Sequence, residues 1–187
     1  MDALGIRRFQ TADVAHACGI PFAALHHWLA RDLVDLVGDP GLSPGSGRRR
    51  LFSRRGVRHI ALTAELVRLG LSVRRASRAA LHFSNVGEAP GGFEGERLDR
   101  SHPDWRDPGG LFKTGRTMLF VSLEDRDEGS VPTATVKLVD GEHPALWSLF
   151  DCADRQAPAA SVIAVDLNEL CARIDPERVV RIVLIPT

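Results

Sequence analysis

The sequence predicts an α+β protein in two parts: a mainly helical N-terminal part that contains a β-hairpin, and a small C-terminal α+β domain. Up to Phe83, apolar residues recur at helical spacing, with one Gly- and Pro-rich interruption. After residue 111, short continuous or alternating apolar segments are typical of strands. Residues 84–110 are rich in Gly, Pro and charge, which predicts a linker or an irregular loop. The predicted boundaries are therefore 1–83, 84–110 and 111–187.

Charge divides the chain of 187 residues in the same way. Residues 1–87 hold 13 Arg and 6 Asp or Glu, a net charge of +7, whereas residues 88–187 hold 11 Arg or Lys and 18 Asp or Glu, a net charge of −7. A basic part of this kind favours a polyanionic partner, which an acidic part cannot bind on the same surface. The alternative is solvated charge that is unevenly distributed.

The N-terminal part begins with two short helices joined by a tight turn. Thr11 is expected to cap the first helix, and Asp13 adds a negative charge near the positive end of its dipole. Gly19 supplies the left-handed stop, and Ile20-Pro21 starts the second helix. The order helix, tight turn, helix is that of a helix-turn-helix.

The second helix is expected to divide into an apolar face and an outward face. Leu25, Trp28 and Leu29 fall at i, i+3 and i+4 and face the core. The outward face combines small residues, which allow close approach to a surface, with donors for base edges or phosphate. Its members are Ala23, Ala24, His26, His27, Ala30 and Arg31. Without the helix-turn-helix context, an exposed polar face explains the two histidines equally well.

A Gly- and Pro-rich segment after Leu33-Val34 predicts a β-hairpin with a long tip. Arg48, Arg49 and Arg50 lie on its returning strand, where alternation sends at least one of them to each face. Taken alone, a run of three arginines is more typical of solvated charge, and contact with phosphate is the alternative.

Two further helices complete the N-terminal part. Ser53 caps the first and Gly70 ends it, and its buried stripe comprises Val57, Ile60, Ala61, Ala64 and Val67. Arg54, Arg55 and Arg58 lie in its first turns, where cations oppose the helix dipole, and an external anion would account for that cost. Ser72 caps the second. Its inward residues are Val73, Ala76, Ala80 and Phe83, and its outward residues are Arg74, Arg75 and Arg78.

The C-terminal part alternates strands and short helices. The predicted strands are Met118–Leu123, Thr133–Val139, Ser161–Val165 and Val179–Ile185, of which the last is almost continuously apolar and so expected to be central. Helices are expected over Pro144–Phe150 and over Leu167–Ile174, the latter capped by Asp166.

The sequence shows no pattern typical of an enzyme, a cofactor site or a metal site. Asp140, Glu142 and His143 lie close together, but a hairpin turn explains them better than acid–base chemistry. The odd, widely spaced cysteines Cys18, Cys152 and Cys171 are expected to be buried free thiols. The N-terminus does not resemble a signal peptide, and no stretch approaches the roughly 20 apolar residues of a membrane span. We therefore expect a cytoplasmic, nucleoid-associated protein.

Several spaced signals in residues 9–83 together resemble a known family. They are Thr11-Ala12-Asp13-Val14-Ala15 before Gly19-Ile20, Leu25-His26-His27-Trp28 before Leu33-Val34, Gly47-Arg48-Arg49-Arg50-Leu51-Phe52-Ser53 before Val57, and Leu69-Gly70-Leu71-Ser72. In this order they resemble the DNA-binding domain of the MerR family of bacterial transcription regulators. The resemblance covers less than half of the chain.

The resemblance implies a winged helix-turn-helix with two further helices, in which the second helix enters the major groove and the wing lies on the backbone. It assigns Ala24, His26, His27 and Arg31 to the recognition helix, Arg49 and Arg50 to the wing, and Thr11 to a phosphate contact. Arg48, Arg54 and Arg55 join this set as neighbouring cations.

Two departures from the family's pattern limit what the resemblance implies. His26-His27-Trp28 stands where members commonly carry Arg-Tyr-Tyr, so the tyrosine contacts are absent and no base preference carries over. Members also continue into a long dimerisation helix, whereas Gly and Pro follow Phe83 here.

The sequence thus predicts a sequence-specific regulator that binds double-stranded DNA. Self-association through residues 111–187 would make it a dimer or higher homo-oligomer, and RNA polymerase or another protein is a possible partner. The alternatives are a phage repressor or recombination directionality factor, which could bind as a monomer, and a regulator whose C-terminal domain senses a small ligand.

Overall fold

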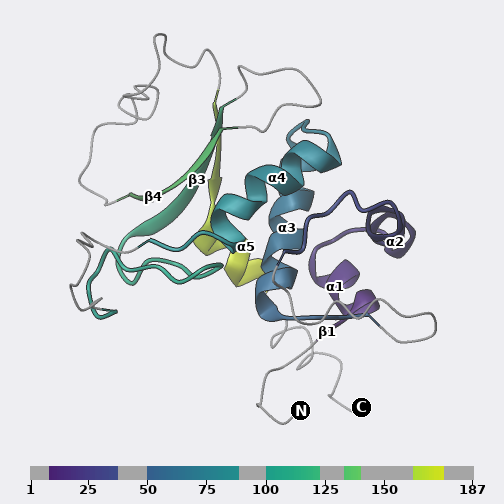
Figure 1. Ribbon diagram of the computed structural model, residues 1–187, viewed down its shortest axis with the longest axis horizontal. Helices are drawn as coiled ribbons and strands as arrows, with labels where there is room; N and C mark the ends of the chain where they lie inside the picture. The colour runs from purple at the N-terminus through teal and green to yellow at the C-terminus, as the bar shows by residue number, and fades with distance from the viewer. Residues whose placement is uncertain (1–8, 38–49, 89–99, 123–132, 140–161, 175–187) are drawn as a thin grey trace.

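A computed structural model describes residues 9–37, 50–88, 100–122, 133–139 and 162–174 (Figure 1). Within these ranges the chain forms five helices, a two-stranded sheet and a three-stranded sheet. The predicted α+β class is therefore confirmed. No helix in the described ranges is both long enough and apolar enough to span a bilayer.

The first elements in the described residues are strand β1 (Phe9–Gln10) and helix α1 (Thr11–Ala17). Gln10, not Thr11, occupies the cap position, and its backbone N–H donates to Asp13 Oδ2 at 3.2 Å. The expected Thr11 cap is therefore wrong, because Thr11 is itself the first helical residue and the cap position falls on the residue before it. The charge of Asp13 in the first turn agrees with the prediction.

The turn after α1 closes as a Schellman motif. Gly19 has a φ of +61°, its N–H donates to His16 O at 3.1 Å, and the N–H of Ile20 donates to Ala15 O at 2.9 Å. This confirms Gly19 as the left-handed stop. Helix α2 (Phe22–Ala30) follows directly, with Pro21 at its cap position.

Strand β2 (Leu51–Phe52) pairs antiparallel with β1, with Phe9 opposite Phe52. Of the arginines expected on this strand, Arg50 lies just before Leu51 and so outside it, and Arg48 and Arg49 fall outside the described residues. Residues 31–37 form turns and irregular chain, not the outgoing strand of a hairpin. The expected tip of the wing also lies outside the described residues.

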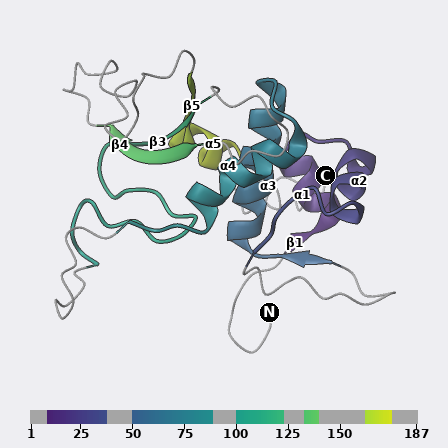
Figure 2. The same cartoon turned by 45° about the horizontal axis from the view of Figure 1, so that its top comes forward.

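Helix α3 (Arg54–Arg68) is the central helix. Ser53 caps it as predicted, because its Oγ accepts from the N–H of Gly56 at 3.1 Å. Burial extends well beyond the predicted stripe, because α3 lies between the α1–α2 pair on one side and the larger sheet on the other (Figure 2). The additional buried residues are Gly56, His59, Leu62, Thr63 and Leu66, whereas Val67 is only half-buried.

Helix α4 (Val73–Ser84) packs along α3 and carries Ser72 at its cap position. The C-terminal carbonyl groups of α4 accept hydrogen bonds from Arg106, whose side chain is 1% exposed. Arg106 donates to Phe83 O in the last turn of α4 at 3.0 Å and to Val86 O, just beyond the helix, at 2.6 Å. The segment expected to be a linker or irregular loop is thus irregular over residues 100–110, but it packs on the end of α4.

The larger sheet contains β3 (Arg116–Ser122), β4 (Ala134–Val139) and β5 (Val162–Asp166) in the order β4-β3-β5, with both pairs antiparallel. Three of the four predicted strands are therefore confirmed. The central strand among those described is β3. The predicted strand 179–185 and the predicted helix 144–150 lie outside the described residues.

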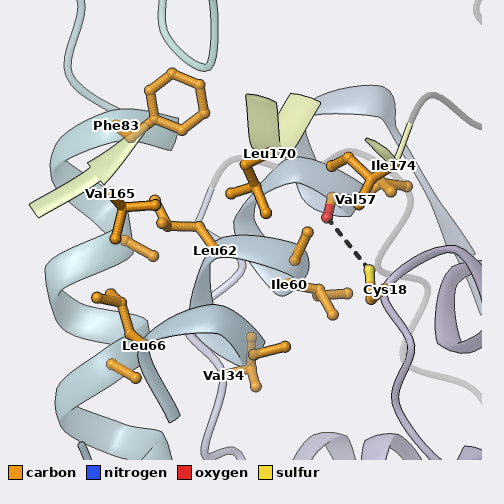
Figure 3. Close-up of a cluster of buried hydrophobic side chains, with 14 of the residues drawn as sticks. Cys18, Val34, Val57, Ile60, Leu62, Leu66, Phe83, Val165, Leu170 and Ile174 are labelled. Carbon is orange, nitrogen blue, oxygen red and sulfur yellow. Dashed lines mark hydrogen bonds between the residues drawn. The ribbon is translucent and has the colours of Figure 1, made fainter. Parts of the chain in front are cut away.

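Helix α5 (Leu167–Arg173) follows β5 and is capped as predicted. Asp166 Oδ1 accepts from the N–H of Asn168 at 2.9 Å and from that of Glu169 at 3.2 Å. Leu170 and Ile174 then reach the core that also contains Ile60 and Leu62 (Figure 3). The described residues of the two predicted parts thus share one hydrophobic core, although their boundaries remain a prediction.

Candidate nucleic-acid interface

Helix α2, the predicted recognition helix, has a buried face and an exposed face. Leu25 and Leu29 are buried as predicted, and Trp28 is half-buried against the same core. Among the predicted outward residues within α2, those exposed are Ala23, His26, His27 and Ala30. These four are predicted outward positions, and the side chains expected to approach a ligand are accessible there.

The other two outward positions differ from the prediction. Ala24 is half-buried and packs against the core, because it lies one turn before Trp28 and shares that residue's face. Arg31 is exposed but lies one residue beyond the last residue of α2, where its N–H donates to His27 O at 3.1 Å. The positive charge of Arg31 at the C-terminal end of α2 interacts favourably with the helix dipole, and it lies at the opposite end of the helix from the first turn.

Sequence reasoning missed Phe22, the first residue of α2. Its side chain is 54% exposed, and its ring centroid lies 6.2 Å from that of His26 at an interplanar angle of 32°. The signal that could have found it is the i,i+4 spacing of two aromatic rings outside the stripe of Leu25 and Leu29.

The cations around β2 and the start of α3 differ in their surroundings. Arg50 is half-buried and Arg54 is exposed. Arg55 is half-buried, and the aliphatic part of its side chain lies against Gly109. Arg58 donates to the carbonyl group of Gly109. Gly109 thus contacts two of these arginines, and an external anion is not required to explain every arginine in the first turns of α3.

Thr11 is half-buried at the start of α1, close to the β1–β2 pair that leads into α3. Its position in the first turn leaves its backbone N–H without an acceptor from its own helix, as in any α-helix. The predicted phosphate contact at Thr11 would therefore lie at the N-terminus of a helix. Because α1 is only seven residues long, this helix end is not by itself a binding site.

A buried histidine organises the scaffold behind α2. The side chain of His59 on α3 is 2% exposed, and its two ring nitrogens meet two hydroxyl groups of α4: Nδ1 lies 2.9 Å from Ser84 Oγ and Nε2 lies 3.0 Å from Ser77 Oγ. Because Ser84 Oγ donates to Asn85 Oδ1 at 2.8 Å, it accepts from Nδ1–H. Nε2 then accepts from Ser77. The ring is neutral, and both nitrogens are satisfied.

This hydrogen-bond chain also holds the segment that follows α2. The backbone N–H of Asp35 donates to Ser77 Oγ at 2.7 Å, and Asn85 Nδ2 donates to Val37 O at 2.9 Å. The chain therefore begins and ends on residues 35–37, and it fixes them to α3 and α4 through His59. Burial, followed by the nearby Arg55 charge, lowers the pKa of His59 to about 3.

A cleft of about 330 Å³ lies where the turn after α1 meets α3 and α5. Its walls include Cys18, Leu170 and Ile174, and its charged groups are Glu65, Arg68 and Arg173. Arg68 donates to Glu65 and to Cys18 O at 2.6 and 2.7 Å, and Arg173 lies 3.4 Å from Glu65. These ion pairs connect α5 to the α1–α2 turn.

Cys18 and Cys171 are buried free thiols, as predicted, and Cys152 lies outside the described residues. Cys18 Sγ donates to Val57 O at 3.9 Å, and burial raises its pKa to about 12, so this thiol is a packing residue (Figure 3). The described ranges contain no group of His, Cys, Asp and Glu side chains that could hold a metal ion. Asp140, Glu142 and His143 are outside them.

Searches for similar proteins found no family model and no curated protein that matches the chain. The assignment of function therefore depends on the geometry of α1, α2 and the cationic segments beside them.

Proposed function

We propose that the chain is a sequence-specific regulator of transcription that binds double-stranded DNA through a MerR-like winged helix-turn-helix. In this proposal α2 enters the major groove. Arg48, Arg49 and Arg50, with Arg54 and Arg55, lie along the phosphate backbone. The protein acts in the bacterial cytoplasm as a homo-oligomer, with RNA polymerase or another protein as its partner.

The observation that carries the proposal is the exposed face of α2. This helix follows a tight glycine turn, buries Leu25 and Leu29 against the core, and leaves His26 and His27 exposed between small alanines. Imidazole groups donate to or accept from base edges and phosphate, and small neighbours permit close approach to a groove wall. The net charge of +7 on residues 1–87 supplies the attraction to a polyanion.

The scaffold supports this use of α2. A helix that reads bases must hold its position within a fraction of an ångström, and the His59 hydrogen-bond chain fixes the segment directly behind it. Leu36 and Val34 anchor the same segment in the core. These contacts give α2 a defined position at the surface.

The test is selection from a random duplex library followed by affinity measurements. We expect the intact protein to enrich a defined sequence, and His27→Ala to lose about 1 to 3 kcal/mol of discrimination per base contact while keeping most non-specific binding. His16→Ala is the matched control, because His16 is an exposed histidine on α1. Equal losses on selected and random DNA would reassign His27 to phosphate contact.

The cleft beside the α1–α2 turn favours one variant of this function, a regulator that responds to a small ligand. Its volume of about 330 Å³ is at the lower end of the range for ligand pockets, and it includes residues of both predicted parts. It is not a cavity inside residues 111–187, where the sensor alternative placed one. A phage repressor or a recombination directionality factor would use the same face of α2.

A further inference from the structure

Phe22 is a large apolar side chain placed at the start of α2 with more than half of its surface exposed. Its exposed fraction is 54%, although the neighbouring apolar residues Leu25 and Leu29 are buried. When a partner covers exposed aromatic surface and removes it from water, the free energy of the system falls. The described residues therefore leave more than half of the Phe22 side chain uncovered.

The ring of Phe22 is held beside His26. The two residues are one turn apart, their ring centroids are 6.2 Å apart, and both side chains are on the exposed face of α2. Ala23 between them is small and exposed. The pair thus presents one flat apolar ring and one polar ring at the N-terminal end of the helix.

We propose that Phe22 contacts the 5-methyl group of a thymine in the major groove and so determines specificity. This inference rests on the proposed DNA-binding function. The N-terminal residues of a recognition helix are those that reach base edges in a helix-turn-helix. Thymine is the base that presents a methyl group in the major groove, and phenylalanine is one of the side chains that contact it.

Charge and neighbours favour DNA over a protein as the occupant of this surface. Residues 1–87 carry a net charge of +7, and the groups next to Phe22 on the helix surface are histidines and alanines instead of a larger apolar patch. A single exposed ring with polar neighbours fits a methyl group on a groove floor. Contact with a second copy of the chain is the competing occupant.

The experiment removes single methyl groups from the DNA. The probe is the duplex that the intact protein selects from a random library, with each thymine in turn replaced by 2′-deoxyuridine. The parent should bind about fourfold more weakly when one particular thymine loses its methyl group, since burying one such group is worth about 0.8 kcal/mol. With Phe22→Ala, the same replacement should change the affinity less than about 1.5-fold. Without the Phe22 ring, less of the methyl group is buried, and the free energy of burial scales roughly with the buried apolar area.

Two further variants keep the result interpretable. Phe22→Leu retains an apolar side chain and should keep a reduced sensitivity to the methyl group. Leu69→Ala removes an exposed apolar side chain at the end of α3 and should keep the full parental sensitivity. Circular dichroism should show that all three variants fold, because neither position is in the core.

The outcomes separate this inference from the proposed function. If no duplex is selected, both fail. A selected duplex with no thymine whose methyl group matters to the parent, or a Phe22→Ala protein with undiminished sensitivity, would overturn the inference while leaving DNA binding in place. Loss of self-association in Phe22→Ala, with methyl sensitivity retained, would assign the ring to a contact between copies.

Discussion

Replacement of His59 by Gln should remove a specific part of the acid sensitivity of the fold. His59 is buried, neutral and doubly hydrogen-bonded, and its pKa in the folded chain is about 3. An unfolded chain binds a proton at His59 near the ordinary histidine pKa of about 6.5. Below that pH the unfolded state gains protons that the folded state does not bind, so the free energy of unfolding falls as pH falls from about 6.5 towards 3.

The size of the effect follows from these two pKa values. Between pH 7 and pH 5 the difference in proton binding at one such site amounts to about 2 kcal/mol. Gln has a donor and an acceptor for Ser84 and Ser77 but does not titrate. We expect His59→Gln to be less stable than the parent at pH 7, and to lose about 2 kcal/mol less than the parent between pH 7 and pH 5.

Urea unfolding followed by far-ultraviolet circular dichroism at both pH values measures this difference. Other groups that titrate in the same interval contribute equally to parent and variant and cancel in the comparison. His16→Gln makes the same chemical change at an exposed position and serves as the control. The reasoning is wrong if parent and His59→Gln lose the same stability on acidification.

Three other changes have expected outcomes. Arg106→Met should lower the free energy of unfolding by about 3 kcal/mol or more in urea titrations, because it leaves carbonyl groups at the end of α4 without their charged donor; a decrease below about 1 kcal/mol would contradict the role of this side chain. Replacing Arg49 and Arg50 by Ala should reduce the slope of log affinity against log salt by about 0.9 for each phosphate group that is no longer neutralised, and an unchanged slope would reject the wing assignment. A fragment of residues 1–87 should unfold without a cooperative transition in calorimetry, because it lacks Arg106 and exposes the faces of α3 and α4 that the sheet and α5 cover; a fragment as stable as the intact chain would contradict the shared core.

Local signals were predictable wherever a few adjacent residues determine the geometry. Gly19 ends α1 because only a residue free of a Cβ adopts its left-handed conformation cheaply, and Ser53 and Asp166 cap helices through side chains that reach the next turn. The alternation of β4 likewise follows from a period that a sheet with one buried face imposes.

Features that depend on residues distant in the sequence were not predictable. The cap of α1 is Gln10 and not the predicted Thr11. The pairing of β1 with β2, a strand distant in the sequence, determines where this helix begins. Arg106 gave no sequence signal for its burial in a segment expected to be a linker. His59 is one polar residue in an amphipathic helix, and only the packing of α4 and residues 35–37 around α3 makes it the centre of a hydrogen-bond chain.

The candidate site shows the same division. The exposed positions of His26 and His27 follow from the helical spacing of Leu25 and Leu29, and were predicted. Ala24 was misplaced because its exposure depends on where Trp28 packs, and Arg31 because the helix ends at Ala30. Phe22 was missed because an apolar residue at the start of a helix is ordinarily expected to be buried.

The ratio of dissociation constants for a selected and a scrambled duplex of equal length tests the central claim most directly. Both are measured with the intact protein at one physiological salt concentration. A sequence-specific regulator should bind the selected duplex at least about 1,000-fold more tightly. A ratio near one, or no binding to either duplex even at low salt, would contradict the account.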